Sequence, residues 1–246
     1  MRRTSLIAGT VRSDSVNDGL APVLLVHGWG GSFEATWQRS GFTELLADAG
    51  RTVIGVDLLG HGEAPKPHEP DAYADLTARI VDVLPDEPVD AVAFSLGAMT
   101  LLRLAARGPE RFGSIVVAGV GRNLFERDQE HRTRILAGVE GTAPDDDNVA
   151  RLFGQYAAQA GNDRHALAAL LRRDDEGPFT EAELASVKNP VLVVIGDRDF
   201  AGPGDELVAA LPDARLTTLR NVDHFATPES FGFIDAALEF LDAVPT

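Results

Sequence analysis

The sequence predicts an α/β protein: a doubly wound, mostly parallel sheet into which a helical cap is inserted. Short β-branched runs alternate with helical patterns along the chain, which is typical of this class. The runs are almost continuously apolar, as strands are when helices cover both faces of a parallel sheet. Residues 122–188 break the alternation, because they hold helical patterns and acidic linkers but no strand-like run.

Six apolar runs are expected to form the sheet, at 23–27, 52–57, 90–94, 114–118, 191–195 and 215–219. Each run ends in a glycine-rich or polar turn. Helices are expected at 43–49, 73–84, 98–107, 206–211 and 229–244, where apolar residues recur at helical spacing. Residues 6–11, with a turn near 17–19, predict an antiparallel hairpin at the edge of the sheet.

The helical stretch divides the chain into a core and a cap. Helical patterns at 132–139, 149–160 and 164–173 predict a cap lying over the sheet. The core is therefore assigned to 1–121 and 189–246, and the cap to 122–188. A chain of 246 residues is long enough to build one large core without disulfides or metals.

Composition excludes several functions. The absence of cysteine excludes a disulfide scaffold, a thiolate metal site and a cysteine nucleophile. A net charge of −16 disfavours nucleic acid and anionic membrane surfaces as partners. No apolar run reaches the roughly 18 residues of a membrane span. The apolar stretch after Met1 is too short for a signal peptide. A cytoplasmic location is therefore expected.

Ser95 is the candidate nucleophile. In Ala93-Phe94-Ser95-Leu96-Gly97 a buried strand is followed at once by a serine and then by a helix. Such a serine should project from a strained turn at the carboxyl edge of the sheet. Gly97 provides the small residue that the close approach of strand and helix requires, whereas Ala93 stands where glycine is commonest. A serine that caps an ordinary helix is the alternative interpretation.

A serine hydroxyl needs a base to take its proton, and His224 is the candidate. Of the six histidines, only His224 lies in the loop between the last expected strand and the last expected helix. A carboxylate must then orient the imidazole. Asp199, three residues beyond Gly196, is preferred for this role, with Asp197 as the fallback. Asp223 is next to His224 in the chain and is ill-placed to contact its ring, so a structural role within the loop is expected.

Backbone N–H groups are expected to bind the oxyanion that forms when a serine attacks a carbonyl carbon. The turn that begins at His27-Gly28-Trp29-Gly30 follows the first core strand. The candidate donors are the N–H of Trp29 and the N–H of Leu96 at the start of a helix. His27 is interpreted as a structural brace for the glycine turn.

The order Ser95, Asp199, His224, with each residue just after a different strand, resembles the α/β-hydrolase superfamily. The turn at Asp57-Leu58-Leu59-Gly60-His61-Gly62 is similar to a structural turn of that superfamily, and the resemblance extends from Leu20 to Phe240. It implies a serine hydrolase that cleaves a carboxylic ester or a related acyl bond through an acyl-enzyme. It implies no metal and no organic cofactor. One position differs from the superfamily: Asp223 stands where glycine commonly precedes the histidine, here His224.

An uncharged ester with a short-to-medium acyl chain is the expected small-molecule substrate, because the motif loops carry no basic cluster. Aromatic residues are predicted to line an apolar pocket, together with Trp29 and Leu96; they are Phe125, Phe153, Tyr156, Phe200 and Phe225. Packing within the cap is an equal alternative for Phe125, Phe153 and Tyr156.

Other functions are compatible with the same residues. A carbon–carbon hydrolase, a lyase or a peracid-forming enzyme could use the same three side chains without a cofactor. A hydrolase-like ligand receptor is an alternative of a different class. A nucleotide-dependent oxidoreductase is disfavoured. Its dinucleotide-binding turn could begin at Gly28-Trp29-Gly30 or at Gly119-Val120-Gly121, but Phe33 and Leu124 stand where the third glycine of that turn is needed.

Overall fold

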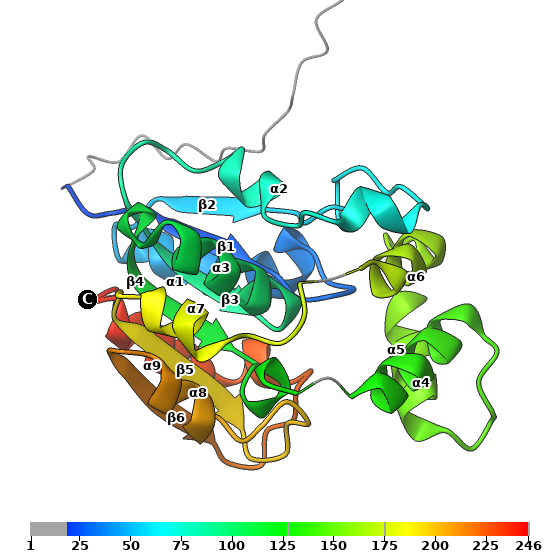
Figure 1. Cartoon of the computed structure of the whole chain (residues 1–246). Helices are drawn as coiled ribbons and strands as arrows, with labels where there is room; N and C mark the ends of the chain where they lie inside the picture. Colours follow the sequence, from blue (N-terminus) through cyan, green and yellow to red (C-terminus); the bar gives the residue numbers. More distant parts are fainter. Residues whose placement is uncertain (1–18, 127, 175, 246) are drawn as a thin grey trace, which may run out of the picture.

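The computed structural model describes residues 19–126, 128–174 and 176–245. In these residues six parallel strands form one sheet in the order β2-β1-β3-β4-β5-β6 (Figure 1). The strands are β1 (Val23–Val26), β2 (Val53–Val56), β3 (Val89–Phe94), β4 (Phe112–Ala118), β5 (Val191–Gly196) and β6 (Ala214–Leu219). All six expected runs are therefore strands. The hairpin expected at 6–11, with its turn near 17–19, lies outside the described residues except for Gly19.

Strand β1 shows why the runs are continuously apolar. Its four side chains are fully buried and alternate between the two faces of the sheet. Leu24 and Val26 belong to the hydrophobic cluster on one face, and Val23 and Leu25 to the cluster on the other. Both faces of the strand need apolar side chains, so an alternating polar pattern is absent.

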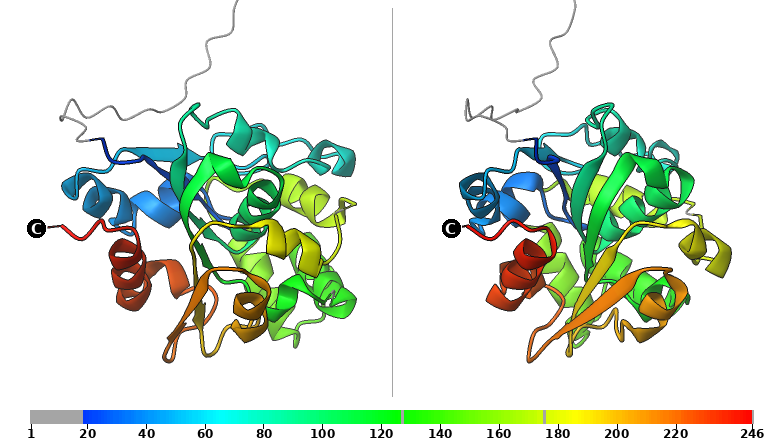
Figure 2. Two further views of the ribbon diagram at one scale, coloured as in Figure 1. Left: turned by 60° about the vertical axis from the view of Figure 1, so that its left-hand side comes forward. Right: turned by 90° about the vertical axis from the view of Figure 1, so that its left-hand side faces the viewer.

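Helices cover both faces of the sheet (Figure 2). One face packs against α1 (Phe42–Asp48) and α9 (Phe231–Phe240), and the other against α2 (Ala78–Val81), α3 (Leu96–Arg107) and α8 (Asp205–Ala210). A further helix, α7 (Glu181–Ser186), packs against α3. Five short turns of helix complete the core; they are η1 (Glu34–Gln38), η2 (Pro70–Tyr73), η3 (Pro109–Arg111), η4 (Arg122–Leu124) and η5 (Thr227–Glu229).

The helix expected at 73–84 is wrong over most of its length. The structure has η2 and the four-residue α2 instead, separated by bends at 74–77. Asp75 Oδ1 accepts hydrogen bonds from the backbone N–H and the hydroxyl of Thr77, at 2.8 and 2.6 Å. Such a side-chain turn competes with the hydrogen bonds of a continuing helix. The final helix is also shorter than expected and begins only after Ser230, which caps it.

Three helices stand beyond the carboxyl ends of the strands, on the right of Figure 1. They are α4 (Gln129–Glu140), α5 (Asn148–Ala157) and α6 (Arg164–Arg172). An aspartate side chain caps each one and accepts a backbone N–H from its first turn; the three are Asp128, Asp147 and Asp163. The acidic linkers of the sequence therefore supply helix caps. The boundaries of the cap at 122 and 188 stay a prediction.

None of the described helices is both long enough and apolar enough to cross a bilayer.

Candidate active site

Ser95 follows β3 at the place where the strand order reverses. Strand β1 pairs with β2 on one side and with β3 on the other, so the loops after β1 and β3 leave the same edge as neighbours. The two backbones come very close there. A Cβ atom at Gly97 would lie 2.4 Å from the backbone oxygen of His27. Any larger residue would push these loops apart.

The backbone of Ser95 is strained. Its φ of 51° and ψ of −115° are uncommon for a residue other than glycine. The backbone N–H donates to Ala118 O at 2.8 Å, and α3 begins at the next residue. This turn places the hydroxyl 2.9 Å from His224 Nε2, at the edge of the sheet that the strand–serine–helix pattern predicts.

Three side chains from three loops form one hydrogen-bonded chain. Ser95 Oγ lies 2.9 Å from His224 Nε2. The other ring nitrogen, Nδ1, lies 2.9 and 3.0 Å from the carboxylate oxygens of Asp199. A carboxylate only accepts, so Nδ1 carries the hydrogen and Nε2 is left to accept the serine proton. His224 and Asp199 are 5% and 9% exposed, so water is largely kept from this chain.

Asp197, the fallback acid, does not reach the imidazole. It is exposed, and its Oδ1 accepts the backbone N–H of Asn221 at 2.8 Å. The loop that carries His224 crosses the end of β5, where Arg198 N–H donates to Val222 O at 3.1 Å. Asp223 Oδ1 accepts a backbone N–H three residues later, at 3.0 Å. Asp223 thus closes the turn after His224 without contacting the ring.

The turn that holds Trp29 lies beside Ser95, because a Cβ added at Gly28 would be 3.3 Å from Ser95 Cβ, and Leu96 follows Ser95 directly. Within the described chain, neither the N–H of Trp29 nor that of Leu96 donates to a protein acceptor. Trp29 lies in a tight turn in which Gly31 N–H donates to Gly28 O at 3.2 Å. Unpaired donors beside a serine hydroxyl are what an oxyanion requires.

The side chain of His27 braces the turn from Gly28 to Gly31. Its Nδ1 lies 2.7 Å from Gly28 O, and its Nε2 accepts the N–H of Leu58 at 3.1 Å. Burial lowers the pKa of His27, so the ring is neutral at pH 7 and each nitrogen has one role. Both nitrogens are engaged in backbone hydrogen bonds, which matches the bracing role expected for this residue.

Comparisons with known proteins agree with this geometry. Residues 21–131 match a family model described as the alpha/beta hydrolase fold. The chain is 28% identical to the pimeloyl-[acyl-carrier protein] methyl ester esterase of Neisseria meningitidis serogroup C, over 85% of this chain and 89% of that protein. It is 24% identical to 2-hydroxy-6-oxononadienedioate/2-hydroxy-6-oxononatrienedioate hydrolase 2 of Pseudomonas putida, over 87% and 84% of the two chains.

Solved structures have the same architecture. One is the 2-hydroxy-6-oxo-6-phenylhexa-2,4-dienoate hydrolase of a Rhodococcus strain, with a TM-score of 0.69, 20% identity and 91% of each chain covered. Another is a thermophilic esterase of Thermogutta terrifontis, with a TM-score of 0.67, 22% identity and coverage of 92% and 91%. This chain has the α/β-hydrolase fold. The predicted superfamily, fold class and enzyme class are confirmed.

Aromatic rings surround the imidazole of this α/β-hydrolase. Phe200 and Phe225 lie 4.3 and 5.6 Å from the His224 ring, measured between centroids. Phe153 packs on both phenylalanines, and Tyr156 packs on Phe225 at 5.2 Å. Four of the five predicted pocket aromatics therefore gather at one place.

The aromatic cluster differs from the predicted pocket at two residues. Phe125, the fifth aromatic, packs against the core cluster on the α3 face instead. His131 of α4 joins the ring cluster, 5.2 Å from Phe200, although the sequence analysis assigned it no role. Burial lowers the pKa of His131. Its approach depends on how α4 lies over the sheet, which no local pattern indicates.

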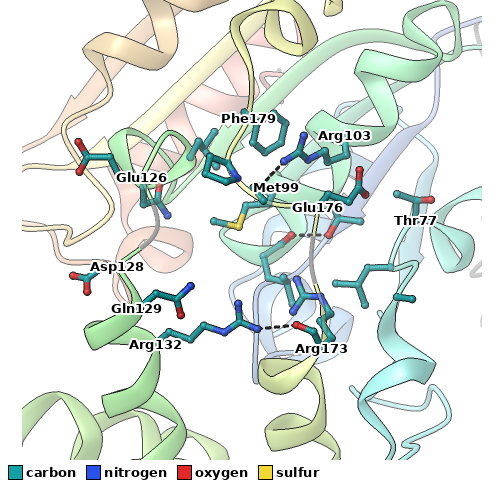
Figure 3. A pocket seen from close by; sticks show the side chains of 18 residues that line it. Thr77, Met99, Arg103, Glu126, Asp128, Gln129, Arg132, Arg173, Glu176 and Phe179 are labelled. Atoms are coloured by element: carbon teal, nitrogen blue, oxygen red, sulfur yellow. Dashed lines mark hydrogen bonds between the residues drawn. The ribbon is translucent and has the colours of Figure 1, made fainter.

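A cavity of about 230 Å³ opens beside Leu96, between α3 and the cap of the α/β-hydrolase (Figure 3). Its lining includes Met99 and Thr100 of α3, and none of the five predicted aromatics. Charged side chains of both signs line it; they are Arg103, Arg132, Arg173, Glu126, Asp128 and Glu176. Among the described residues of the lining, three positive and three negative groups therefore balance in formal charge.

The cavity arginines are held by protein oxygens. Arg103 pairs with Glu183, donates to Gly177 O at 2.6 Å and stands 3.7 Å over the ring of Phe179. Arg132 donates to Arg173 O at 2.9 Å. Within the described residues, no group of three or more histidine, aspartate or glutamate side chains is arranged to hold a metal ion.

Proposed function

We propose that this α/β-hydrolase cleaves carboxylic esters with Ser95 as nucleophile, His224 as base and Asp199 as the orienting acid. The observation that carries the proposal is the unbroken path from Ser95 Oγ to His224 Nε2 at 2.9 Å, and from Nδ1 to the Asp199 carboxylate at 2.9 Å. Both distances are hydrogen-bond distances, and the first is short enough for His224 to take the Ser95 proton.

The proposed reaction passes through an acyl-enzyme. His224 Nε2 takes the Ser95 proton as Oγ attacks the carbonyl carbon, and the Asp199 carboxylate stabilises the imidazolium that forms. The N–H groups of Trp29 and Leu96 bind the oxyanion. Collapse of the tetrahedral intermediate breaks the ester bond, and His224 gives its proton to the leaving alcohol. Water, deprotonated by the same histidine, then releases the acid and restores Ser95.

We propose an uncharged ester with a short or medium acyl chain as the substrate class. The balanced charges of the cavity beside Leu96 support this, because they offer no net attraction for a polyanion. The apolar rings around His224 also support it. Relatives of 28% identity are named as pimeloyl-[acyl-carrier protein] methyl ester esterases, which agrees with a small leaving alcohol. The net charge of −16 supports the absence of nucleic-acid and membrane partners.

The test is an ester panel run with the wild type and with Ser95→Ala. Methyl, ethyl and 4-nitrophenyl esters of two- to eight-carbon acids are compared with monomethyl esters of dicarboxylic acids and with a dienoate diketone that a carbon–carbon hydrolase would cleave. We expect uncharged esters to be preferred, and Ser95→Ala to lower kcat by about 10⁴ or more.

Ser186→Ala is the matched control, because this serine lies on α7 and its hydroxyl donates to Ala182 O at 2.9 Å. It should retain wild-type turnover. Full esterase activity in Ser95→Ala would overturn the assignment of the nucleophile. Turnover of the diketone but of no ester would replace the proposed ester hydrolase with a carbon–carbon hydrolase.

A further inference from the structure

The turn proposed to bind the oxyanion is held by the cap as well as by the core. Asn162, in the loop before α6, donates from Nδ2 to Gly30 O at 2.8 Å and to Tyr156 O at 3.2 Å. Both partners are carbonyl oxygens, which only accept, so the amide nitrogen must face them. The hydrogen bond to Gly30 joins residues 132 positions apart in the chain.

Two more cap contacts hold the same turn. The indole N–H of Trp29 donates to Leu167 O of α6 at 3.5 Å. The ring of Tyr156 covers Gly30, where an added Cβ would lie 2.6 Å from Tyr156 Cδ1. Gly30 has a φ of +73°, which side chains other than glycine rarely adopt. The cap therefore encloses both central residues of the turn.

The conformation of this turn decides where the Trp29 N–H points. A glycine at the centre of this turn gives its backbone access to more than one conformation, because glycine adopts positive and negative φ about equally. Contacts from outside the turn must therefore select one of them. Of these contacts, Asn162 makes the shortest hydrogen bond from the cap, and it reaches Gly30, directly after Trp29.

We propose that Asn162 is a positioning residue that couples docking of the cap to formation of the oxyanion site. This inference rests on the proposed function, since it assigns the Trp29 N–H to the oxyanion. Asn162 does not touch the reacting atoms and acts through the turn. Loss of its hydrogen bond weakens binding of the oxyanion, which exists only in the transition state, and leaves binding of the ester itself almost unchanged.

The experiment compares Asn162→Asp and Asn162→Ala with the wild type. Aspartate keeps the shape of the side chain but turns a carboxylate oxygen toward two carbonyl oxygens, so the hydrogen bonds are replaced by repulsion. Removing a direct oxyanion donor lowers kcat by about 10²–10³. Because Asn162 acts indirectly, we expect a smaller effect in both variants: kcat should fall by about tenfold, and KM should stay within about twofold of the wild-type value. Affinity for an alkyl trifluoromethyl ketone, an oxyanion-forming inhibitor, should fall by the same factor.

Asn148→Asp is the matched control. Asn148 is an exposed asparagine at the start of α5, and its Oδ1 accepts a hydrogen bond from Arg151. The Asn148→Asp substitution adds the same negative charge to the cap as Asn162→Asp, and it should leave kcat, KM and inhibitor affinity unchanged. Unchanged kcat in Asn162→Asp would overturn the inference. A higher KM with the wild-type kcat would also overturn it, because the cap contact would then serve only substrate binding.

Two additional measurements separate the outcomes. Hydrogen exchange of peptides that contain Gly31 should be faster in Asn162→Asp, and unchanged exchange contradicts the coupling whatever the activity. If the Asn162 variants do not fold, Trp29→Phe removes the indole hydrogen bond to Leu167 and keeps the backbone N–H. It should lower kcat more than it raises KM, and the reverse contradicts the inference. Absence of Ser95-dependent ester turnover in the wild type would instead refute the proposed function.

Discussion

Both carboxylate oxygens of Asp199 lie within hydrogen-bond distance of one nitrogen of His224, Nδ1, at 2.9 and 3.0 Å. Asp197, two residues earlier, instead accepts the N–H of Asn221. The two acids stand on the same short loop after β5, yet only one of them faces the site.

These two acids form a matched pair for mutation. We expect Asp199→Asn to lower kcat by about 10⁴, because an amide in this place favours the wrong tautomer of the histidine. Asp197→Asn should keep kcat within about twofold. Steady-state kinetics on the preferred ester checks both variants. The opposite ranking of the two would make Asp197 the functional acid.

Gly97 is required by packing. We expect Gly97→Ala to destabilise the protein by about 1–3 kcal/mol or more, since the added methyl group would meet the backbone oxygens of His27 and Val26 at 2.4 and 2.8 Å. Backbone atoms cannot move aside as a flexible side chain can. Urea denaturation measures the change. Gly108→Ala is the control, because its nearest neighbour would be 3.4 Å away, and a loss of stability as large as that of Gly97→Ala would contradict the packing argument.

His61 should make the fold sensitive to acid. Its ring is buried, and this burial, with the nearby His27, lowers the pKa of His61 to about 3. The unfolded chain has the ordinary value of about 6.5 and therefore binds a proton that the fold does not bind. Stability should fall as pH falls below about 6.5, by up to about 1.4 kcal/mol per pH unit for this group.

The pH dependence is checked by urea denaturation between pH 7 and pH 4. His61→Gln should flatten the curve by the slope of one proton, because glutamine does not titrate. His165→Gln, at an exposed position of α6, is the control and should keep the wild-type slope. Equal slopes in all three proteins would show that His61 does not carry this dependence.

Removal of Arg51, a buried arginine far from the active site, should strongly destabilise the fold. Arg51 is 5% exposed, pairs with Asp90, and donates to Ala21 O at 2.9 Å and Leu241 O at 2.7 Å. We expect Arg51→Met to cost about 3–5 kcal/mol, since it leaves the Asp90 carboxylate without its partner. Chemical denaturation tests this. Arg39→Met, which breaks the exposed pair with Glu34, should change stability little, and similar losses would refute the argument from burial.

The sheet and the position of its functional loops could be predicted from local patterns. Each apolar run became a strand because both faces of the sheet are covered, a requirement that each strand meets within its own few residues. A serine between a buried strand and a helix, and a histidine after the last strand, are likewise local signals. They indicate which edge of a parallel sheet carries the site.

Helix boundaries were predictable only where no side chain competed. The continuous helix expected at 73–84 does not form, because Asp75 makes a side-chain turn with Thr77. Helix α7 was not predicted, although Thr180 and Glu183 form the reciprocal capping pattern that marks a helix start. That signal was present in the sequence and could have been used.

The sequence by itself determined the superfamily, the parallel sheet and the order of the candidate residues, because these depend on short runs and on chain order. Only the tertiary structure decided between Asp197 and Asp199, moved Phe125 away from the ring cluster, brought His131 into it and joined Asn162 to Gly30. These outcomes depend on where loops and cap helices meet across long separations in the chain. Residues so far apart leave no local pattern, since their contact exists only once the chain has folded.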